Sequence, residues 1–170
     1  MWPDVHVGSI SLVETWFDHV LQAPEGRLFI IAPFIDIELL DACGALHSFW
    51  QAINHKQSRL RLWTATWDLA IAVSSALSVW PWQELMVYYG GPLHAKAYLH
   101  MPARRSPSAL IGSMNFTRSG LRGCGELGVL LTPGTNTALN RLLFNLWQEL
   151  ETEAVGHPAC RPLATRGGLK

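Results

Sequence analysis

The sequence has few charged side chains and no net charge. Lysine and arginine together number 13, as do aspartate and glutamate, and charged residues make up only 15% of the 170 residues. A protein that held nucleic acid mainly through its overall field would be basic, so any phosphate recognition must come from a local group of side chains. Because 49% of the residues are hydrophobic, the composition is typical of a compact globular protein and excludes a disordered one.

Cysteine and long apolar runs are also scarce. Cys43, Cys124 and Cys160 are odd in number and have no paired metal-ligand spacing, which is typical of reduced thiols in a cytoplasmic protein. The N-terminus lacks a basic region followed by an apolar run, and the longest weakly polar stretch, residues 69–80, is too short to span a bilayer. We therefore expect a cytoplasmic protein without a membrane partner.

Tryptophan, by contrast, is abundant, with eight residues in the chain. We expect most of these side chains to pack in the core or in an interface between subunits. The alternative is that some of them stack on a substrate base or line a partner surface.

The spacing of apolar residues predicts alternating helices and strands. Helices are expected over residues 9–21, 39–53 and 66–77 and from Asn136 onward, and strands over residues 27–35, 59–63, 93–100, 108–113 and 126–131. This alternation predicts an α/β fold in which a mixed, mostly parallel sheet is sandwiched between helices. Residues 1–155 are expected to form a single domain, followed by a loose tail, 156–170, that is rich in glycine and proline.

One expected strand, residues 93–100, has chemically different faces. Side chains alternate along a strand, so His94, Lys96, Tyr98 and His100 share one face while small and apolar residues occupy the other. We expect the apolar face to pack inward. The polar face presents an imidazole and an ammonium group two residues apart, and both can reach the same phosphate.

The next strand is expected to return antiparallel through a turn at residues 104–105. Folding the chain there places Lys96 opposite Ser113, and His94 opposite Asn115. These four side chains should therefore gather at one end of the hairpin. The two arginines of the turn should lie at the other end, away from any site.

The order of these residues resembles the signature of the phospholipase D superfamily. That signature is H-x-K, then an aspartate after four further residues, then G-S-x-N, and a glutamate on the following strand. Residues 94–96 (H-A-K), residues 112–115 (G-S-M-N) and Glu126 correspond to it, and the resemblance spans roughly residues 27–150. It implies the phospholipase D-like fold and a phosphodiester hydrolase closest in type to the small single-motif bacterial nucleases.

The resemblance also implies a mechanism for these residues. His94 would attack phosphorus and form a phosphohistidine, while a second imidazole protonates the leaving oxygen. Lys96 and Asn115, supported by Ser113, would bind the non-bridging oxygens. Glu126 would accept a hydrogen bond from the far ring nitrogen of His94 and fix its tautomer. No metal or other cofactor is implied.

The sequence departs from the family signature at one position. Met101 stands where the family has its aspartate, and no carboxylate stands beside it. This leaves open whether catalysis is impaired. A zinc site made of His94, His100 and Cys124 has no standard ligand spacing, and we do not expect one. Packing or supporting roles are expected for Tyr98 and His100.

Two arginines follow the G-S-x-N segment. Arg118 and Arg122 are four residues apart and share a face if that segment is helical, which makes them candidates for flanking phosphate contacts. The alternative is a solvated surface, on which Glu126 would pair with Arg122 and not with a histidine.

The function that we expect is a metal-independent nuclease that cleaves DNA or RNA. The mechanism needs two imidazoles, and the chain has one H-x-K and one G-S-x-N segment, so the active site is expected to be shared by a homodimer. The alternatives are a non-catalytic nucleic-acid-binding or assembly subunit of a defence or DNA-processing complex and, third, a phospholipase.

Overall fold

The computed structural model describes residues 5–8, 10–55, 58–90, 94–122, 126–156 and 161–163. In these ranges an eight-stranded sheet has the strand order β1-β7-β6-β5-β2-β3-β4-β8. The strands are β1 (Val5–Gly8), β2 (Gly26–Ile31), β3 (Arg59–Thr64), β4 (Glu84–Tyr89), β5 (Ala97–Pro102), β6 (Ser108–Gly112), β7 (Gly128–Leu131) and β8 (Arg161–Leu163). The helices are α1 (Ile10–Gln22), the 3-10 turn η1 (Ile37–Leu39), α2 (His47–His55), α3 (Trp67–Leu77), α4 (Arg118–Leu121) and α5 (Thr137–Gly156).

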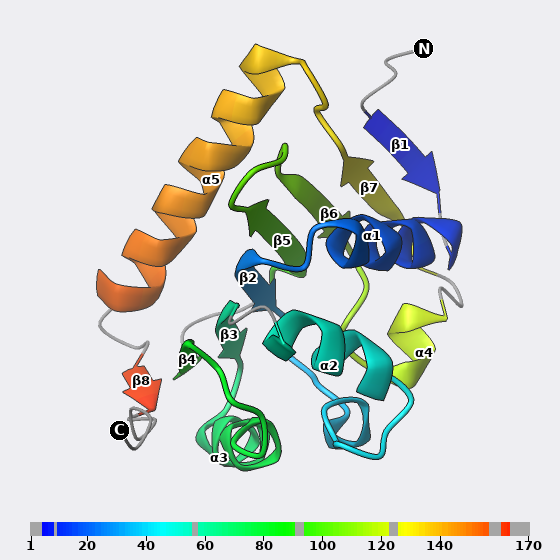
Figure 1. Cartoon of the computed structure of the whole chain (residues 1–170). Helices are drawn as coiled ribbons and strands as arrows, with labels where there is room; N and C mark the ends of the chain where they lie inside the picture. Colours follow the sequence, from blue (N-terminus) through cyan, green and yellow to red (C-terminus); the bar gives the residue numbers. More distant parts are fainter. Residues whose placement is uncertain are drawn as a thin grey trace.

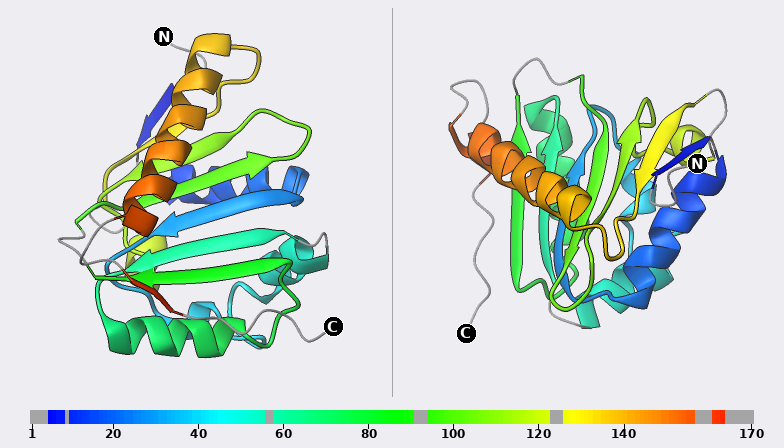
Figure 2. Two further views of the ribbon diagram at one scale, coloured as in Figure 1. Left: turned by 90° about the vertical axis from the view of Figure 1, so that its left-hand side faces the viewer. Right: turned by 90° about the horizontal axis from the view of Figure 1, so that it is seen from above.

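Helices cover both faces of the sheet, and α5 lies on the face opposite to α1, α2 and α3 (Figures 1 and 2). Side chains of β2 alternate between the two cores. Leu28 and Ile30 pack toward α1 and α2, whereas Phe29 and Ile31 pack toward α5. A strand that is buried on both faces reads as a continuous apolar run, which explains the sequence from residue 28 to residue 32. The expected α/β sandwich is confirmed.

The sheet is mixed, as expected, but parallel pairing is confined to β2, β3 and β4. The other neighbouring pairs, β1–β7, β7–β6, β6–β5, β5–β2 and β4–β8, are antiparallel. The parallel part is therefore smaller than the sequence indicated. A connection as short as the five residues between β5 and β6 can join only antiparallel neighbours.

The helix expected over residues 39–53 is confirmed only from His47 onward, because the chain first forms η1 and a turned segment before α2 begins. In that segment the side chain of Asp41 accepts a hydrogen bond from the backbone N–H of Cys43 over 3.2 Å. Such a local bond competes with helical hydrogen bonding. Gly44 N–H also bonds Asp41 O over 2.9 Å, so the chain turns before α2 begins.

Three strands were not expected from the sequence. β1 pairs with β7, β4 pairs with β3, and β8 pairs with the outer edge of β4. β8 lies in the segment expected to be a loose tail, and the other residues after Gly156 lie outside the described ranges. No helix in the described part of the chain is both long and apolar enough to cross a bilayer.

Candidate active site

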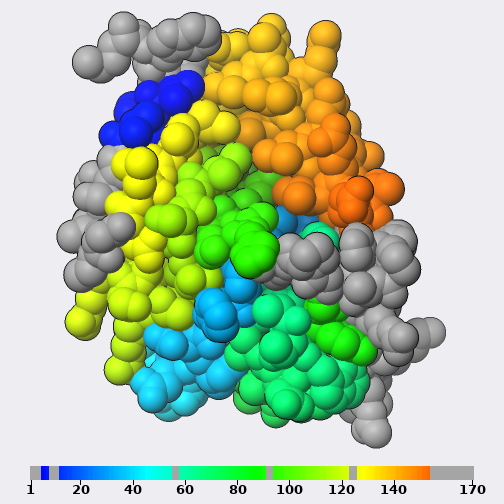
Figure 3. All heavy atoms as spheres, turned by 180° about the vertical axis from the view of Figure 1, so that it is seen from behind, coloured from blue at the N-terminus to red at the C-terminus, as the bar shows by residue number. Residues whose placement is uncertain are grey.

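The signature segments meet at one edge of the sheet. β2 and β6 end at this edge, whereas β5 and β7 begin there. Residues 94–96 therefore precede β5, residues 113–115 follow β6, and Glu126 lies just before β7. Figure 3 views this face: the bright green atoms that lead into β5 lie near its centre, between the blue atoms of the β2–η1 connection and the yellow-green atoms of the β6–α4 connection.

We expected His94 and Lys96 to lie on a strand. In the structure they lie on an irregular segment instead. The side chain of His94 is exposed, that of Lys96 is half-buried, and β5 begins only at Ala97. The reason is that β2 has already ended at Ile31, which pairs with Ala97, so earlier residues have no strand on that side. Lys96 Nζ donates a hydrogen bond of 2.8 Å to the backbone oxygen of His94. The ammonium group thus lies beside the residue that carries the imidazole.

The expected register of the hairpin is wrong by one residue. Gly112 N–H bonds the backbone oxygen of Lys96 over 3.1 Å, so Lys96 lies opposite Gly112 and not opposite Ser113. Ser113 turns toward β7 instead, where its N–H donates to Leu127 O over 3.0 Å. The shift does not separate the segments, because both still end at the same edge.

Ser113 binds the segment that leads into β7. Its hydroxyl donates a hydrogen bond to the carboxylate of Glu126 and accepts one of 3.1 Å from Leu127 N–H. The expected partner of Glu126 was the ring of His94; within the described residues its carboxylate bonds Ser113, and no ion pair joins it to Arg122. A serine has one hydroxyl proton, and Ser113 uses it in the bond to Glu126. Ser113 therefore stabilises the loop before β7 and has no proton left to donate to a phosphate.

The amide of Asn115 faces the end of β2. Its Oδ1 accepts a hydrogen bond of 3.4 Å from Phe34 N–H. Asp36 N–H in turn donates to Phe116 O over 2.9 Å, and Ile35 bridges Phe116. These contacts hold the β2–η1 connection against the G-S-x-N segment. With its oxygen engaged by the backbone, Asn115 has its Nδ2 hydrogens left to donate to the oxygens of a bound anion.

A buried tyrosine of β5 anchors the G-S-x-N segment to the core. Tyr98 is 1% exposed, and its hydroxyl donates a hydrogen bond of 2.8 Å to the backbone oxygen of Met114. Burial raises the pKa of Tyr98, and the nearby charge of Glu126 raises it further, so the phenol remains a donor. Its ring packs against Trp16 and Phe116, with centroids 5.6 and 6.0 Å away. The sequence placed Tyr98 on the expected polar face but could not show this anchoring contact.

Two glycines permit close approaches of the backbone at the site. A Cβ atom on Gly112 would lie 2.4 Å from Leu127 O, and one on Gly120 would lie 2.4 Å from Asn115 O. Both distances are far inside a normal contact, and the atoms met are backbone atoms that cannot move aside alone. The glycine of the G-S-x-N segment is therefore required by the packing of β6 on β7.

The two candidate arginines belong to α4 and its C-terminal cap. Arg118 is 55% exposed and pairs with Glu38 over 2.5 Å, while its backbone N–H donates to Asp36 Oδ2 over 2.7 Å. Arg122 is exposed. An exposed ion pair contributes only about 0–1 kcal/mol, so Glu38 does not prevent Arg118 from binding a phosphate.

His100 lies away from this edge. It is 2% exposed, and burial lowers its pKa to about 4, so it is neutral at pH 7. Cys124, the third residue of the disfavoured zinc site, lies outside the described residues. Within the described part of the chain, no group of three or more histidine, cysteine or carboxylate side chains is placed to hold a metal ion.

Met101 lies at the opposite end of β5 from the site, where it pairs with Arg27. Because a strand rises about 3.3 Å per residue, the Cα atoms of Lys96 and Met101 are roughly 16 Å apart. A carboxylate at this position would not touch a phosphate bound beside His94. The departure from the family signature therefore removes no group from the candidate site.

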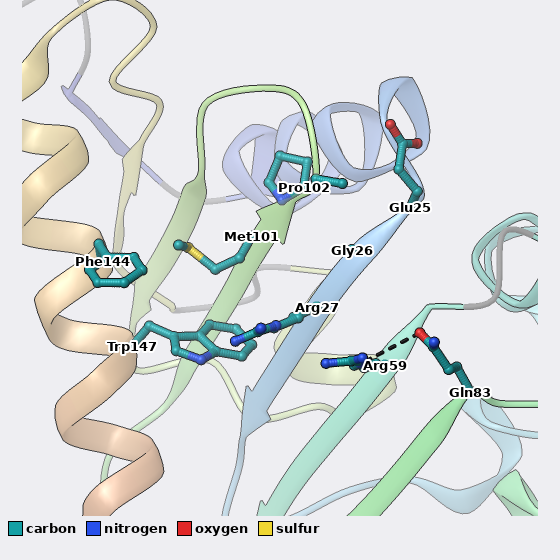
Figure 4. Close-up of a pocket in the computed structure, with 10 residues that line it drawn as sticks. Glu25, Gly26, Arg27, Arg59, Gln83, Met101, Pro102, Phe144 and Trp147 are labelled. Atoms are coloured by element: carbon teal, nitrogen blue, oxygen red, sulfur yellow. Dashed lines mark hydrogen bonds between the residues drawn. The ribbon is translucent and has the colours of Figure 1, made fainter.

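A cavity of about 550 Å³ lies near Met101, between α5 and the opposite edge of the sheet (Figure 4). Arg27, Arg59 and Trp147 contribute to its lining, and Arg59 Nε donates to Gln83 Oε1 over 3.2 Å. The described residues that line it include none of the signature residues. We therefore place the candidate active site at the other edge of the sheet.

Comparison with known proteins identifies the fold. No family model and no curated sequence matches the chain. Among solved structures, the phospholipase D family member Nuc from Salmonella typhimurium is similar to this chain with a TM-score of 0.57 and 14% identity. The alignment includes 94% of this chain and 97% of Nuc. NucT from Helicobacter pylori has a TM-score of 0.55 at 11% identity, with 95% of its length and 86% of this chain aligned.

Phosphatidylserine synthase from Haemophilus influenzae also aligns with 94% of this chain, with a TM-score of 0.58 and 14% identity, but over only 39% of its own length. The expected resemblance is thus confirmed at the level of architecture. The chain has the phospholipase D-like fold.

Proposed function

We propose that the protein is a phosphodiesterase and, more specifically, a metal-independent nuclease that cleaves DNA or RNA. The observation that carries this proposal is the meeting of His94, Lys96 and Asn115 at one edge of a phospholipase D-like fold. An imidazole, an ammonium and an amide donor supply a nucleophile and the groups that stabilise charge on a phosphoryl oxygen.

The proposed reaction has two steps. His94 attacks phosphorus, the bond to the leaving oxygen breaks, and the imidazolium of the partner subunit's His94 donates its proton to that oxygen. Water then attacks the phosphohistidine, the N–P bond breaks, and the partner subunit's His94 takes up the proton. Lys96 and Asn115 bind the non-bridging oxygens throughout, and Tyr98 and Ser113 hold the segment that carries Asn115.

The second imidazole is the reason for proposing a homodimer. The chain supplies one H-x-K segment and one G-S-x-N segment, and a two-fold axis beside His94 would bring a second set to the same phosphate. The exposed position of His94 at the rim of the sheet suits such an axis. The alignment covers almost all of Nuc and NucT but only 39% of phosphatidylserine synthase, which favours the single-motif nuclease over a lipid-processing enzyme.

The second candidate is a non-catalytic nucleic-acid-binding or assembly subunit of a defence or DNA-processing complex. One observation favours it: the carboxylate of Glu126 bonds Ser113 and not the ring of His94. A protein of this kind would bind nucleic acid at the same edge but would not cleave it.

Cleavage assays separate these candidates. Wild-type protein, His94→Ala and Lys96→Ala would be incubated in excess EDTA with labelled single-stranded DNA, duplex DNA, RNA, bis(p-nitrophenyl) phosphate and phosphatidylcholine vesicles. We expect cleavage of nucleic acid by the wild type, none by folded His94→Ala, and a turnover lowered by orders of magnitude for Lys96→Ala. Binding without any cleavage supports the second candidate, and cleavage of the lipid alone supports a phospholipase.

A further inference from the structure

Three aromatic side chains lie at the same edge of the sheet as the candidate site. The carboxyl ends of the parallel strands β2, β3 and β4 meet at this edge. Phe34 follows β2, Trp67 follows β3, and Tyr89 is the last residue of β4. Phe34 is 63% exposed and Trp67 is 46% exposed, while Tyr89 is half-buried. The rings of Trp67 and Tyr89 meet edge to face, with centroids 4.8 Å apart. We call these three residues the aromatic row.

The aromatic row is continuous with the candidate site. The backbone N–H of Phe34 donates to Oδ1 of Asn115, the side chain proposed to bind a phosphoryl oxygen. The exposed side chain of Phe34 therefore belongs to a residue whose backbone contacts the side chain proposed to bind the phosphate. Figure 3 shows the atoms of the β2–η1 connection, in blue, lying next to those of the β3–α3 junction, in teal, on this face.

The backbone beneath the row is held firmly. Ala32 N–H donates to Trp63 O over 3.0 Å, and the buried hydroxyl of Thr64 donates to Pro33 O over 3.2 Å. The indole of Trp63 donates to Gly90 O over 3.0 Å. These bonds join the ends of β2, β3 and β4, so the backbone that carries the exposed rings is ordered before a ligand binds.

The charge around the row is not that of a phosphate-binding groove. The carboxylates of Asp36, Glu38 and Asp68 lie in the same or adjoining segments, and the chain as a whole has no net charge. Lys96 and Arg118 supply positive charge at the candidate site, so further affinity along the row must come from contacts that do not depend on charge. Stacking of bases on aromatic rings is such a contact, and it accepts any base because every base has a flat face.

We propose that the aromatic row is a stacking platform for unpaired bases next to the cleaved phosphate, and that the substrate is a single-stranded nucleic acid. This inference rests on the proposed function and names its substrate class. In a duplex the flat faces of the bases are already stacked on one another, so only a single strand can place them on Phe34 and Trp67. Neighbouring strands are about 4.8 Å apart, so the ends of β2 and β4 are separated by roughly two such spacings. This distance leaves room for more than one base.

The test measures binding and cleavage separately. Dissociation constants for a fluorescent single-stranded oligonucleotide and for its duplex would be measured in the His94→Ala background, with Phe34→Ala, Trp67→Ala and Trp67→Phe each added. KM and kcat for the same strands and for bis(p-nitrophenyl) phosphate, which has no base, would be measured in the otherwise wild-type protein. Phe144→Ala is the matched control, because Phe144 is 50% exposed but belongs to α5 on the other face.

We expect Phe34→Ala and Trp67→Ala each to raise the dissociation constant and KM for the single strand by roughly 5- to 150-fold. Trp67→Phe should restore most of the binding, Phe144→Ala should change nothing, and kcat/KM for the small diester should stay constant. Wild-type binding of the single strand should exceed that of the duplex and should weaken little between low and moderate salt.

Unchanged single-strand binding in both alanine variants, while the small diester is still cleaved, would overturn the platform and leave the proposed function standing. Light scattering that shows dissociated subunits in the Phe34→Ala or Trp67→Ala protein would also overturn it, because the row would then belong to the subunit interface. Failure of the wild type to cleave any substrate would instead contradict the proposed function itself.

Discussion

Removing the hydroxyl of Tyr98 tests whether the G-S-x-N segment is positioned from the core. Tyr98→Phe keeps the ring that packs against Trp16 and Phe116 but deletes the 2.8 Å hydrogen bond to Met114 O. A buried carbonyl that loses its partner costs about 1–3 kcal/mol of folding free energy. For a domain of this size, each kcal/mol lowers the melting temperature by about 2–4 °C, so we expect a decrease of roughly 2–12 °C.

The same change should affect catalysis, because Met114 stands between Ser113 and Asn115. Small displacements of a group that binds the reacting phosphate can cost up to about 100-fold in rate, and we expect kcat to fall by about 10- to 100-fold with a smaller change in KM. The assay is thermal or urea unfolding together with steady-state cleavage at a temperature where the variant is fully folded. Tyr88→Phe is the control, since Tyr88 is equally buried but packs toward α5. A destabilised Tyr98→Phe protein with unchanged kcat would refute the positioning argument.

The other predictions concern packing, pH and metal ions. Gly112→Ala should destabilise the protein by several kcal/mol or prevent folding, because its Cβ atom would lie 2.4 Å from Leu127 O; a normal unfolding curve would contradict this. His100 has a pKa of about 4 in the folded chain against an ordinary value of 6.5, so its contribution to stability is present above pH 6.5 and should fall by about 3 kcal/mol as the pH drops toward 4. Urea unfolding of His100→Gln should lack this part of the pH dependence, and an identical pH profile would show that another group is responsible. Cleavage should persist in excess EDTA, and a strict requirement for added magnesium or manganese would point to a different chemistry.

Much of the architecture followed from local sequence patterns. The apolar run from Leu28 to Ala32 predicted a buried strand. The prediction was correct because helices cover both faces of β2, so every side chain of the run is buried. The hairpin of β5 and β6 was placed to within one residue, because its short turn leaves few ways to pair the flanking strands. The H-x-K and G-S-x-N segments were expected to meet, and the register of the sheet brings them to one edge.

The parts that could not be predicted depend on contacts between distant segments. β1 and β8 are short edge strands whose pairing is decided by β7 and β4, and neither shows an alternating pattern long enough to indicate a strand. The hydrogen bond from Ser113 to Glu126 depends on how two loops pack beside each other. The contact of the Phe34 backbone with Asn115 likewise joins segments that are distant in the sequence, and no local pattern encodes it.

The position of Met101 shows the limit of comparing signatures by residue order alone. From the sequence alone, it was open whether the missing aspartate impairs catalysis. In the fold Met101 lies at the far end of β5, where it pairs with Arg27. A difference within a signature segment must therefore be judged by where the altered side chain lies in the fold.

The central claim is that two copies of His94 act on one phosphate, and mixing chains tests it most directly. Wild-type and His94→Ala chains would be unfolded together in equal amounts, refolded at constant total concentration and assayed on single-stranded DNA. Random pairing leaves about one quarter of the dimers with two imidazoles, so the account predicts about one quarter of the wild-type activity. An activity of about one half would mean that each chain works alone, and it would contradict the shared active site.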